Sequence, residues 1–499
     1  MTEGFLVGSS AGSDPQACRR RLEPALCSDA GSEAAFIWRI TQPQTCGRRA
    51  ESDVCPVMRS GLSSRWGGAI YPVCVAGFCT AALIAGEFKV QVGTAMDKWM
   101  YPFEFGTGGS RPVAPTFASF DPRFDTRDAE FLLGWQTQSV IPTNGVPSRY
   151  VLKRVRLNLT VGRDLVNNAT GERVTFLYDP SFDSYKTHLS PQDPSYQPDQ
   201  DAGRPVEVFA TGFRNGFDAV GYTEDSPFGV VGAFTSNTIS IGTRNSFAAV
   251  FNPKGELIDI ANHVGQANAA WTQPPFEARP WAVGLTDGVN SGESVPLGST
   301  FRFDLELSDP LIAGYVARSL ASGRLSLMVS SLSPAKQVTP GGTGLGGSGA
   351  YPQWSTREDN LFPGPVLEVE GVVLGDTDSD GDGLPDDWER LAFGNLGQGG
   401  TGDPDGDGSS NLAEWTAGTD PLSAVQVLKL TVGGTEMRPT LQFPIRPNRL
   451  YSVERSTDLK TWVAAPGELT YPATGLAAWS GADETPSEAR FFRVRVRPE

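Results

Sequence analysis

The sequence predicts an all-β protein, in which a large jelly-roll or β-sandwich domain is followed by a short acidic spacer and a small C-terminal β-sandwich. Glycine and proline account for 57 and 38 of the 499 residues, a composition typical of proteins with many turns. Apolar and polar residues alternate along several segments, as they do in a strand with one buried face. The stretch 376–421 breaks this alternation with twelve acidic residues and one arginine.

Residues 87–374 are expected to form the large domain. Strands with one face in a core and the other in water are typical of a sandwich or jelly roll. Further strands are expected over 324–331 and 366–373. The alternating apolar residues that predict strands are Phe88, Val90 and Val92, then Val155, Leu157, Leu159 and Val161, and finally Phe301, Phe303, Leu305 and Leu307.

One helix is expected inside this domain, over 311–321. Asp309 can accept a hydrogen bond at the start of the helix, and Pro310 suits the first turn. Gly323 lies just past the predicted end.

Residues 425–499 are expected to form a third unit, a small sandwich of about six short strands. The alternation is clearest near its end, where Phe492, Val494 and Val496 are interleaved with arginines. The phrases YSVERSTDLKTW (451–462) and ARFFRVRV (489–496) resemble a C-terminal β module that follows acidic calcium loops in secreted bacterial proteins.

The acidic stretch contains two twelve-residue loops of one pattern, 378–389 and 403–414. Oxygen-bearing side chains stand at positions 1, 3, 5, 9 and 12, glycine stands at position 6, and position 7 offers its carbonyl, as in a loop that wraps around Ca²⁺. A solvated acidic linker would share the composition but would not repeat this register. The expected ligands are Asp378, Asp380, Asp382, Leu384, Asp386 and Glu389 in the first loop, and Asp403, Asp405, Asp407, Ser409, Asn411 and Glu414 in the second.

We expect a helix after each loop but none before it. These helices are expected over 388–393 and 412–417, with Gly394 and Gly418 at their ends. The residues before the first loop are too few and too rich in β-branched side chains for an entering helix. These half-EF-hand loops resemble those of dockerins and of thrombospondin type 3 repeats. The resemblance implies a secreted or cell-surface protein in which calcium provides rigidity.

Two other stretches resemble the DNRLRE-type β modules of bacterial surface and secreted proteins. They are FLLGWQTQSVIP…YVLKRVRLNLTV, within 131–161, and STREDN…GPVLEVE, within 355–370. The resemblance implies a jelly-roll fold and polysaccharide binding. A long insert, about 162–300, departs from the family pattern.

The first 86 residues differ from the rest because they contain all six cysteines. One interpretation is a small domain held together by disulfides. The interpretation that we favour is a leader over 1–86, in which residues 1–57 are unstructured or lie upstream of the true start.

The second part of this leader has the pattern of a secretory signal peptide. Met58 is followed by arginines at 59 and 65, an apolar run over 69–85 and small residues. We therefore expect a signal peptide over about 58–86 and cleavage near Ala85 or Gly86. A membrane anchor is the alternative, but the run is short and contains Pro72. No other apolar stretch is long enough to span a membrane.

The net charge of −16 argues against nucleic acid and anionic membranes as partners. The two histidines, His188 and His263, lie too far apart for a HExxH motif. We favour a non-catalytic calcium-binding surface or matrix protein that binds polysaccharide or a cell-surface glycan. The alternative is a polysaccharide lyase or hydrolase on the same scaffold, and a hydrolase needs two carboxylates about 5–10 Å apart.

Two tryptophans, Trp271 and Trp281, lie in a proline-rich segment of the insert. Flat aromatic rings stack on the C–H faces of sugars, so these residues are candidates for a glycan platform. The competing interpretation is that they fill the end of the β-sandwich core.

Overall fold

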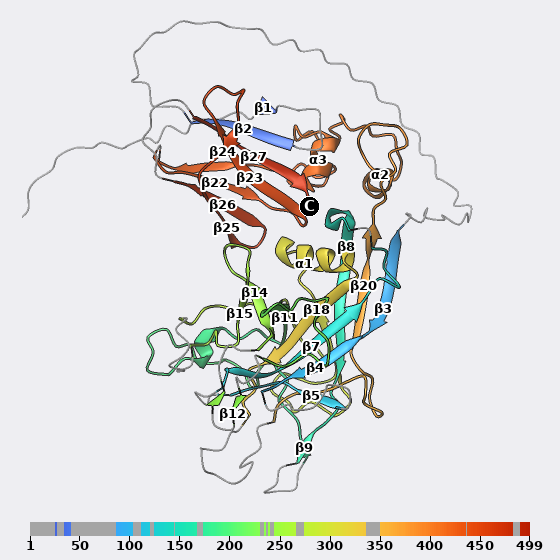
Figure 1. The fold of residues 1–499 in the computed structure, drawn as a ribbon, viewed down its shortest axis with the longest axis vertical. Helices are drawn as coiled ribbons and strands as arrows, with labels where there is room; N and C mark the ends of the chain where they lie inside the picture. The colour runs from blue at the N-terminus through green and yellow to red at the C-terminus, as the bar shows by residue number, and fades with distance from the viewer. Residues whose placement is uncertain are drawn as a thin grey trace, which may run out of the picture.

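The computed structural model describes residues 86–499 and two N-terminal strands, 25–26 and 34–40 (Figure 1). Its gaps are 103–110, 120–123, 144, 167–172, 230–233, 236–237, 240–243, 266–273, 336–349, 436 and 483–489. The expected signal peptide, apart from its last residue, therefore lies outside the described residues.

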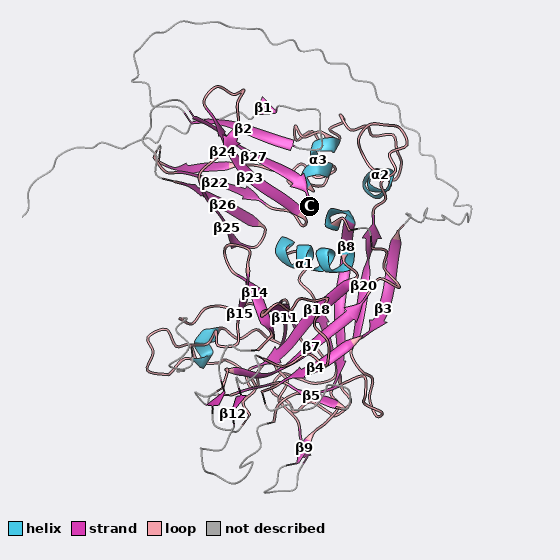
Figure 2. Ribbon diagram, viewed as in Figure 1, coloured by secondary structure: helices cyan, strands magenta, loops and turns pink. Residues whose placement is uncertain are grey.

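The predicted all-β sandwich-type fold is confirmed. Most described elements are strands in antiparallel sheets, and the described α-helices are α1 (Pro310–Ala321), α2 (Asp386–Phe393) and α3 (Asn411–Ala417) (Figure 2). In Figure 1 the large domain lies below, the C-terminal module lies above, and α1 lies between them.

Two sheets form the large domain. The first contains, in order, β15 (Leu257–Asp259), β14 (Ser246–Phe251), β11 (Val206–Phe213), β18 (Arg324–Ser331), β7 (Arg127–Gln136) and β4 (Met96–Met100), with β16 (Ala282–Val283) and β6 (Phe117–Ala118) attached. The second has the order β17 (Thr300–Asp304), β8 (Tyr150–Thr160), β20 (Val366–Val373) and β3 (Glu87–Gly93). Smaller elements are β5 (Val113–Pro115), β9 (Leu165–Val166), β10 (Arg173–Val174), β12 (Phe234–Thr235), β13 (Thr238–Ile239), β19 (Gln353–Ser355) and the 3₁₀ helices Pro147–Arg149 and Tyr185–His188.

The main core lies between the two sheets. Leu157 and Leu159 from β8 and Phe303 from β17 pack together with Leu327 from β18, and all four are buried. The residues from β8 and β17 belong to the predicted alternating segments, and Leu327 belongs to the strand expected over 324–331. The alternation therefore identified the inner face of the smaller sheet correctly.

The larger sheet is buried on both faces. Nine of the ten residues of β7 are buried, although an ordinary sandwich strand buries alternate residues. A second apolar cluster, which includes Met100, Leu132 and Phe209, covers the outer face beneath loops of the region 162–300. That region also contributes β11 and β14 to the middle of the sheet, so it is an integral part of the domain.

Helix α1 closes one end of the sandwich, and its predicted caps are present. The Asp309 carboxylate accepts a hydrogen bond from the Leu311 amide at 2.8 Å, and Gly323 adopts a left-handed conformation with φ of 77°. Val316 and Leu320 enter the main core, while Leu311 packs against the C-terminal module. The helix therefore contacts both units.

The C-terminal module is a two-sheet sandwich. One sheet has the order β21 (Thr431–Gly434), β22 (Pro439–Pro444), β26 (Leu476–Gly481) and β25 (Gly467–Ala473). The other has β1 (Ala25–Leu26), β2 (Ala34–Ile40), β27 (Arg490–Pro498), β23 (Arg449–Ser456) and β24 (Val463–Ala464).

Strand β2 comes from the first 86 residues, for which a leader is expected. It pairs antiparallel with β27, from Ala34 opposite Val496 to Ile40 opposite Arg490 (Figure 1). The expectation of an unstructured segment over 1–57 is therefore wrong for these residues. The edge of β27 offers unpaired backbone groups that any extended segment can pair with, and no side-chain motif is needed for this. That is why the sequence pattern did not predict the pairing.

Candidate metal centre

The two acidic loops lie between the large domain and the C-terminal module. The first loop follows the last strand of the large domain, β20, and leads into α2, and the second leads into α3. Both helices end as predicted, at Gly394 with φ of 74° and at Gly418 with φ of 75°. These left-handed conformations favour glycine, so both half-EF-hand helices end where the sequence indicated.

The first loop brings three predicted ligands together. One carboxylate oxygen from each of Asp378, Asp380 and Asp382 lies within 4.8 Å of the others. The Asp378 carboxylate accepts hydrogen bonds from the amides of Gly381 and Gly383 at 2.8 and 3.0 Å, and these bonds hold the loop closed. Gly383, at position 6, has φ of 94°, which a residue with a Cβ rarely adopts.

Several oxygens of this loop are buried without a hydrogen-bond partner. Both carboxylate oxygens of Glu389 are in this state, as is Oδ2 of Asp382. Glu389 itself is 0 % exposed. A buried carboxylate without a partner is costly, and a cation bound among these oxygens would remove that cost.

The second loop repeats the first. Oxygens of Asp403, Asp405 and Asp407 lie within 4.8 Å of one another, and Asp403 accepts bonds from Gly406 and Gly408 at 2.9 and 3.0 Å. The buried oxygens without a partner here are Oδ2 of Asp405, Oδ2 of Asp407, Oδ1 of Asn411 and Oε2 of Glu414.

The loops differ at position 9. Asn411 keeps its side-chain oxygen free, because only its amide nitrogen is used, donating to the Gly399 carbonyl at 2.9 Å. Both oxygens of Asp386 accept bonds from Ser379, at 2.7 and 2.8 Å, and Oδ2 also accepts one from Arg390. The carboxylate of Asp386 thus already serves to hold the loop. Position 7 is Leu384 in the first loop and Ser409 in the second. The side chain of Leu384 is apolar and buried, so in the first loop this position can offer a metal only its main-chain carbonyl.

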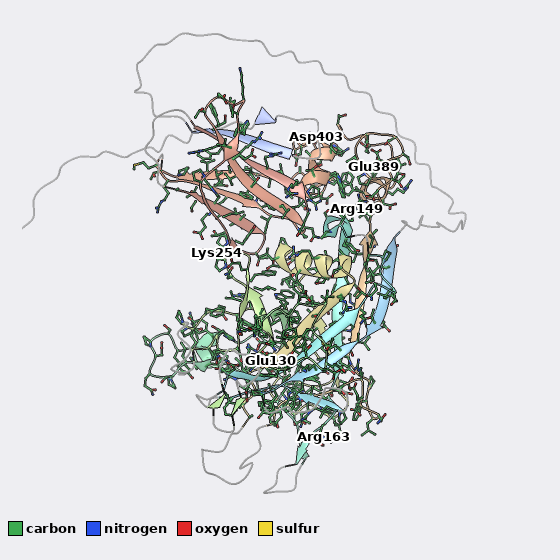
Figure 3. All side chains as sticks on the ribbon, in the orientation of Figure 1. Glu130, Arg149, Arg163, Lys254, Glu389 and Asp403 are labelled. Atoms are coloured by element: carbon green, nitrogen blue, oxygen red, sulfur yellow. The ribbon has the colours of Figure 1, made fainter. Side chains whose placement is uncertain are left out.

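A small apolar core joins the loops to the large domain. Trp388 of α2 and Trp415 of α3 pack with ring centroids 5.8 Å apart. Leu384 and Trp388 share a cluster with Val372 and Leu374, at the end of β20. Figure 3 shows Glu389 and Asp403 on the same side of the molecule as Arg149 of the large domain, and Arg149 forms an ion pair with Asp376.

Helix α3 also packs against the C-terminal module. The Arg449 guanidinium, from β23, donates to the carbonyls of Trp415 and Thr416 at 2.9 and 2.8 Å. These carbonyls belong to the last turn of α3, where a helix leaves acceptors unused. Ala417 lies in the core of the module. The loops therefore contact both β units through their own helices.

The donors of both loops suit Ca²⁺. Carboxylate, amide and carbonyl oxygens are the ligands of a hard cation, and the unpartnered oxygens belong to positions 3, 5, 9 and 12 of the loop pattern. When bound, the ion would supply positive charge that offsets the clustered carboxylates. Asp378, Asp380, Asp382 and Glu389 would hold it in the first loop, and Asp403, Asp405, Asp407, Asn411 and Glu414 in the second.

We expect calcium affinity to fall as the pH falls from 8 to 6. Burial, with the neighbouring aspartates, raises the pKa of Glu389 and of Glu414 to about 7 in the calcium-free protein. A pKa of about 7 is higher than that of glutamate in the unfolded chain. The calcium-free folded protein therefore keeps protons on these two carboxyl groups that the unfolded chain releases. Its stability falls as the pH rises from about 4.5 to 7. Calcium must displace those protons below pH 7.

The apparent affinity of each loop should therefore drop roughly tenfold over this range. Calorimetric titration at pH 8, 7 and 6, in two buffers of different ionisation enthalpy, would measure both affinity and proton release. An affinity independent of pH would contradict the assignment of Glu389 and Glu414 as ligands.

The predicted tryptophan platform does not fit Trp281. This residue is 3 % exposed, and its ring stacks on Phe251 at 5.9 Å and meets Tyr315 edge-on at 4.9 Å. It is a core residue, as in the competing interpretation, because the sheet that it covers needs a large apolar side chain at this edge. Trp271 lies outside the described residues.

A buried ionic network lies beneath the outer face of the larger sheet, and no sequence pattern predicted it. Arg244, which is 0 % exposed, forms ion pairs with Asp125 and Glu130, both at 3.0 Å. Arg127 binds Glu207 at 2.6 Å and approaches His263 at 3.0 Å. Every partner comes from a distant part of the chain, so only the fold reveals the network.

Residues 378–394 and 403–424 match the family model of the bacterial TSP3 repeat. Both matches begin at the first aspartate of a loop, and TSP3 repeats bind calcium and are typical of extracellular proteins. This finding supports the thrombospondin type 3 resemblance, while the dockerin and DNRLRE resemblances stay predictions. No curated protein sequence matches the chain. In the described part of the chain, no helix is long and apolar enough to span a membrane. Residues 378–394 and 403–424 are thus similar to the bacterial TSP3 repeat, and this similarity covers the two acidic loops and the helices that follow them.

Proposed function

We propose that this is a secreted or cell-surface, non-catalytic protein in which the calcium-loaded TSP3 repeat holds the C-terminal module in a fixed position on the large domain. The observation that carries the proposal is that the two loops pack on both units. Trp388 lies in a cluster with the end of β20, and the carbonyls at the end of α3 are bound by Arg449 of the module.

Direct contacts between the two β units support the same conclusion. The Tyr471 amide donates to the Pro253 carbonyl at 2.6 Å. Lys254 forms an ion pair with Glu468 at 2.8 Å, and Arg318 forms one with Glu499 at 3.0 Å. Surface ion pairs contribute at most about 1 kcal/mol each, so these contacts set an orientation but hold it weakly. Two rigid calcium loops would stabilise it further.

The joint between the units forms a cleft of about 1010 Å³, and we propose that it binds a glycan. The half-buried aromatic rings of Phe182 and Tyr471 line it, together with the exposed carboxylates of Glu277 and Glu306. Aromatic faces stack on sugar rings, and carboxylates accept bonds from sugar hydroxyls. The same carboxylates support the second candidate function, a hydrolase.

A glycan array, run beside a reducing-sugar assay on the full chain in calcium, would distinguish the two functions. We expect binding without release of reducing sugar. Phe182→Ala should weaken binding by at least about fivefold, or about 1 kcal/mol, because it removes a ring face. Tyr196→Ala is the matched control, since Tyr196 lies in the same region but outside the cleft lining.

Two outcomes would count against this proposal. Sugar release that Glu306→Gln abolishes while binding persists would indicate the hydrolase. Equal effects of Phe182→Ala and Tyr196→Ala would exclude the cleft as the binding site.

A further inference from the structure

A separate acidic cluster lies in the large domain, away from the TSP3 repeat. One carboxylate oxygen from each of Asp179, Asp183 and Asp201 lies within 4.8 Å of the others. The first two belong to the segment Asp-Pro-Ser-Phe-Asp (179–183), in which oxygen-bearing residues recur at every second position. The same spacing brings three aspartates together in each TSP3 loop.

One carboxylate of this cluster has a buried oxygen without a partner. Asp179 is 2 % exposed, and its Oδ1 accepts bonds from the amide and hydroxyl of Ser181, both at 2.8 Å. Its Oδ2 is buried and has no hydrogen-bond partner. A single carboxylate oxygen left in this state, beside two other carboxylates, calls for a cation.

The surroundings compensate only part of this negative charge. Four aspartates lie here, since Asp199 joins the three of the cluster, and Arg204 is the cation paired with them among the described ion pairs. Arg204 contacts Asp183 at 2.7 Å and Asp199 at 2.5 Å. Asp179 and Asp201 are left without a basic partner in the described part of the chain.

Another acidic cluster of the same domain provides a contrast. Oxygens of Asp97, Glu224 and Glu358 also lie within 4.8 Å of one another. There, the Arg357 guanidinium contacts all three carboxylates, at 3.4, 2.5 and 2.7 Å respectively. In that cluster one arginine contacts every carboxylate, whereas in the cluster at Asp179 the arginine, Arg204, contacts Asp183 alone of the three members.

The backbone conformation at Gly203 allows Asp201 to lie close to Asp179. Gly203 has φ of 113°, and a Cβ built there would come within 2.9 Å of the Leu177 carbonyl and 3.2 Å of the Asp179 side chain. Only glycine lets the 201–204 segment approach this closely. The Ser181 hydroxyl lies 2.8 Å from both Asp179 and Asp201, and its single hydrogen can be donated to only one of these carboxylates at a time.

We propose that Asp179, Asp183 and Asp201 bind a third calcium ion. Three carboxylates form a hard, anionic donor set, and water would complete the six to eight oxygens that Ca²⁺ takes. Pro180 and Phe182, which alternate with these donors, line the cleft between the β units. The ion would therefore fix one wall of that cleft. This last consequence rests on the proposed glycan function, whereas the calcium site itself does not.

The site can be tested by counting calcium ions on the full chain. After chelation and desalting, calorimetric titration with CaCl₂ should show three equivalents, two from the loops and one from the cluster. The double variant Glu389→Gln/Glu414→Gln should keep one equivalent. Asp201→Asn should lose one and keep two, and its exposed position makes a folding defect avoidable. Asp179→Asn provides a second variant, read by the same count.

Asp193→Asn is the matched control. Asp193 is exposed and lies between Asp183 and Asp201 in the chain, and its side chain accepts a bond from the Ser195 amide, so all three equivalents should remain. The proposal is overturned if the double glutamine variant is folded by circular dichroism and binds no calcium, or if Asp201→Asn still binds three equivalents. If the unchanged protein binds three equivalents of calcium but no glycan, the proposed function alone is refuted.

Discussion

Removing calcium is expected to release the C-terminal module from the large domain. At a dissociation constant of about 10⁻⁴–10⁻³ M, typical of extracellular modules, millimolar calcium stabilises each loop by about 1 kcal/mol, and by about 2.7 kcal/mol at a hundredfold excess. Without it, the carboxylates of each loop repel one another, and the Trp388–Trp415 core and the bonds of Arg449 to α3 lose their support.

Chelation should therefore increase protease cleavage within 375–421 and raise the radius of gyration in X-ray scattering, while the β core of 87–374 stays folded. The variant Glu389→Gln/Glu414→Gln should behave in the same way without a chelator, because it removes the charged, buried carboxylate that ends each loop. Glu370→Gln, which alters a surface pair with Lys89, is the control and should change neither measurement. Identical protease patterns with and without chelator would contradict calcium-dependent bracing.

Arg244→Met is expected to destabilise the large domain by about 3–5 kcal/mol, because it leaves buried carboxylates without their cation. Arg244 pairs with Asp125 and Glu130 and also donates to the carbonyls of Arg127 and Asp128. Even beside Arg244, burial raises the pKa of Glu130 to about 7. The folded protein thus binds this proton more readily than the unfolded chain, and stability falls as the pH rises from about 4.5 to 7.

Loss of the arginine raises that pKa further, so the destabilisation by Arg244→Met should be larger at pH 8 than at pH 6. Urea unfolding at the two pH values would measure it. Arg302→Met is the matched control, since Arg302 pairs with Asp287 at the surface, and its loss should cost at most about 1 kcal/mol. Equal losses in both variants, or no dependence on pH, would show that the buried network does not stabilise the domain as argued.

Rules that relate neighbouring residues to local structure were sufficient to predict the elements whose sequence patterns lie in one short stretch of the chain. The helix caps at Asp309 and Gly323, the strand over 324–331, and the ends of α2 and α3 all lie where the sequence predicts them. Each depends on residues within one or two turns. The two acidic loops belong to the same class, because the predicted ligands of each loop lie within twelve consecutive residues.

The face that each strand buries was predictable only in part. Alternation identified the inner face of β8 and β17, which have water on the other side. It could not describe β7, where RDAEFLLGW is buried throughout, because loops from 162–300 cover the outer face. Trp281 is also buried, in the main core against Phe251 and Tyr315, although its proline-rich neighbours indicate an exposed loop when read in the sequence alone.

By itself, the sequence determined the all-β class, the caps of the helices and the two acidic loops, since short-range spacing sets backbone conformation and places oxygen donors around one point. Tertiary structure alone decided which distant charges meet. Arg244 pairs with Glu130, and Asp201 reaches Asp179 across a turn that only Gly203 permits. It also decided that β2 pairs with β27. Backbone pairing and ionic contact depend on proximity in space, and the spacing of residues along the chain does not predict which distant residues come together.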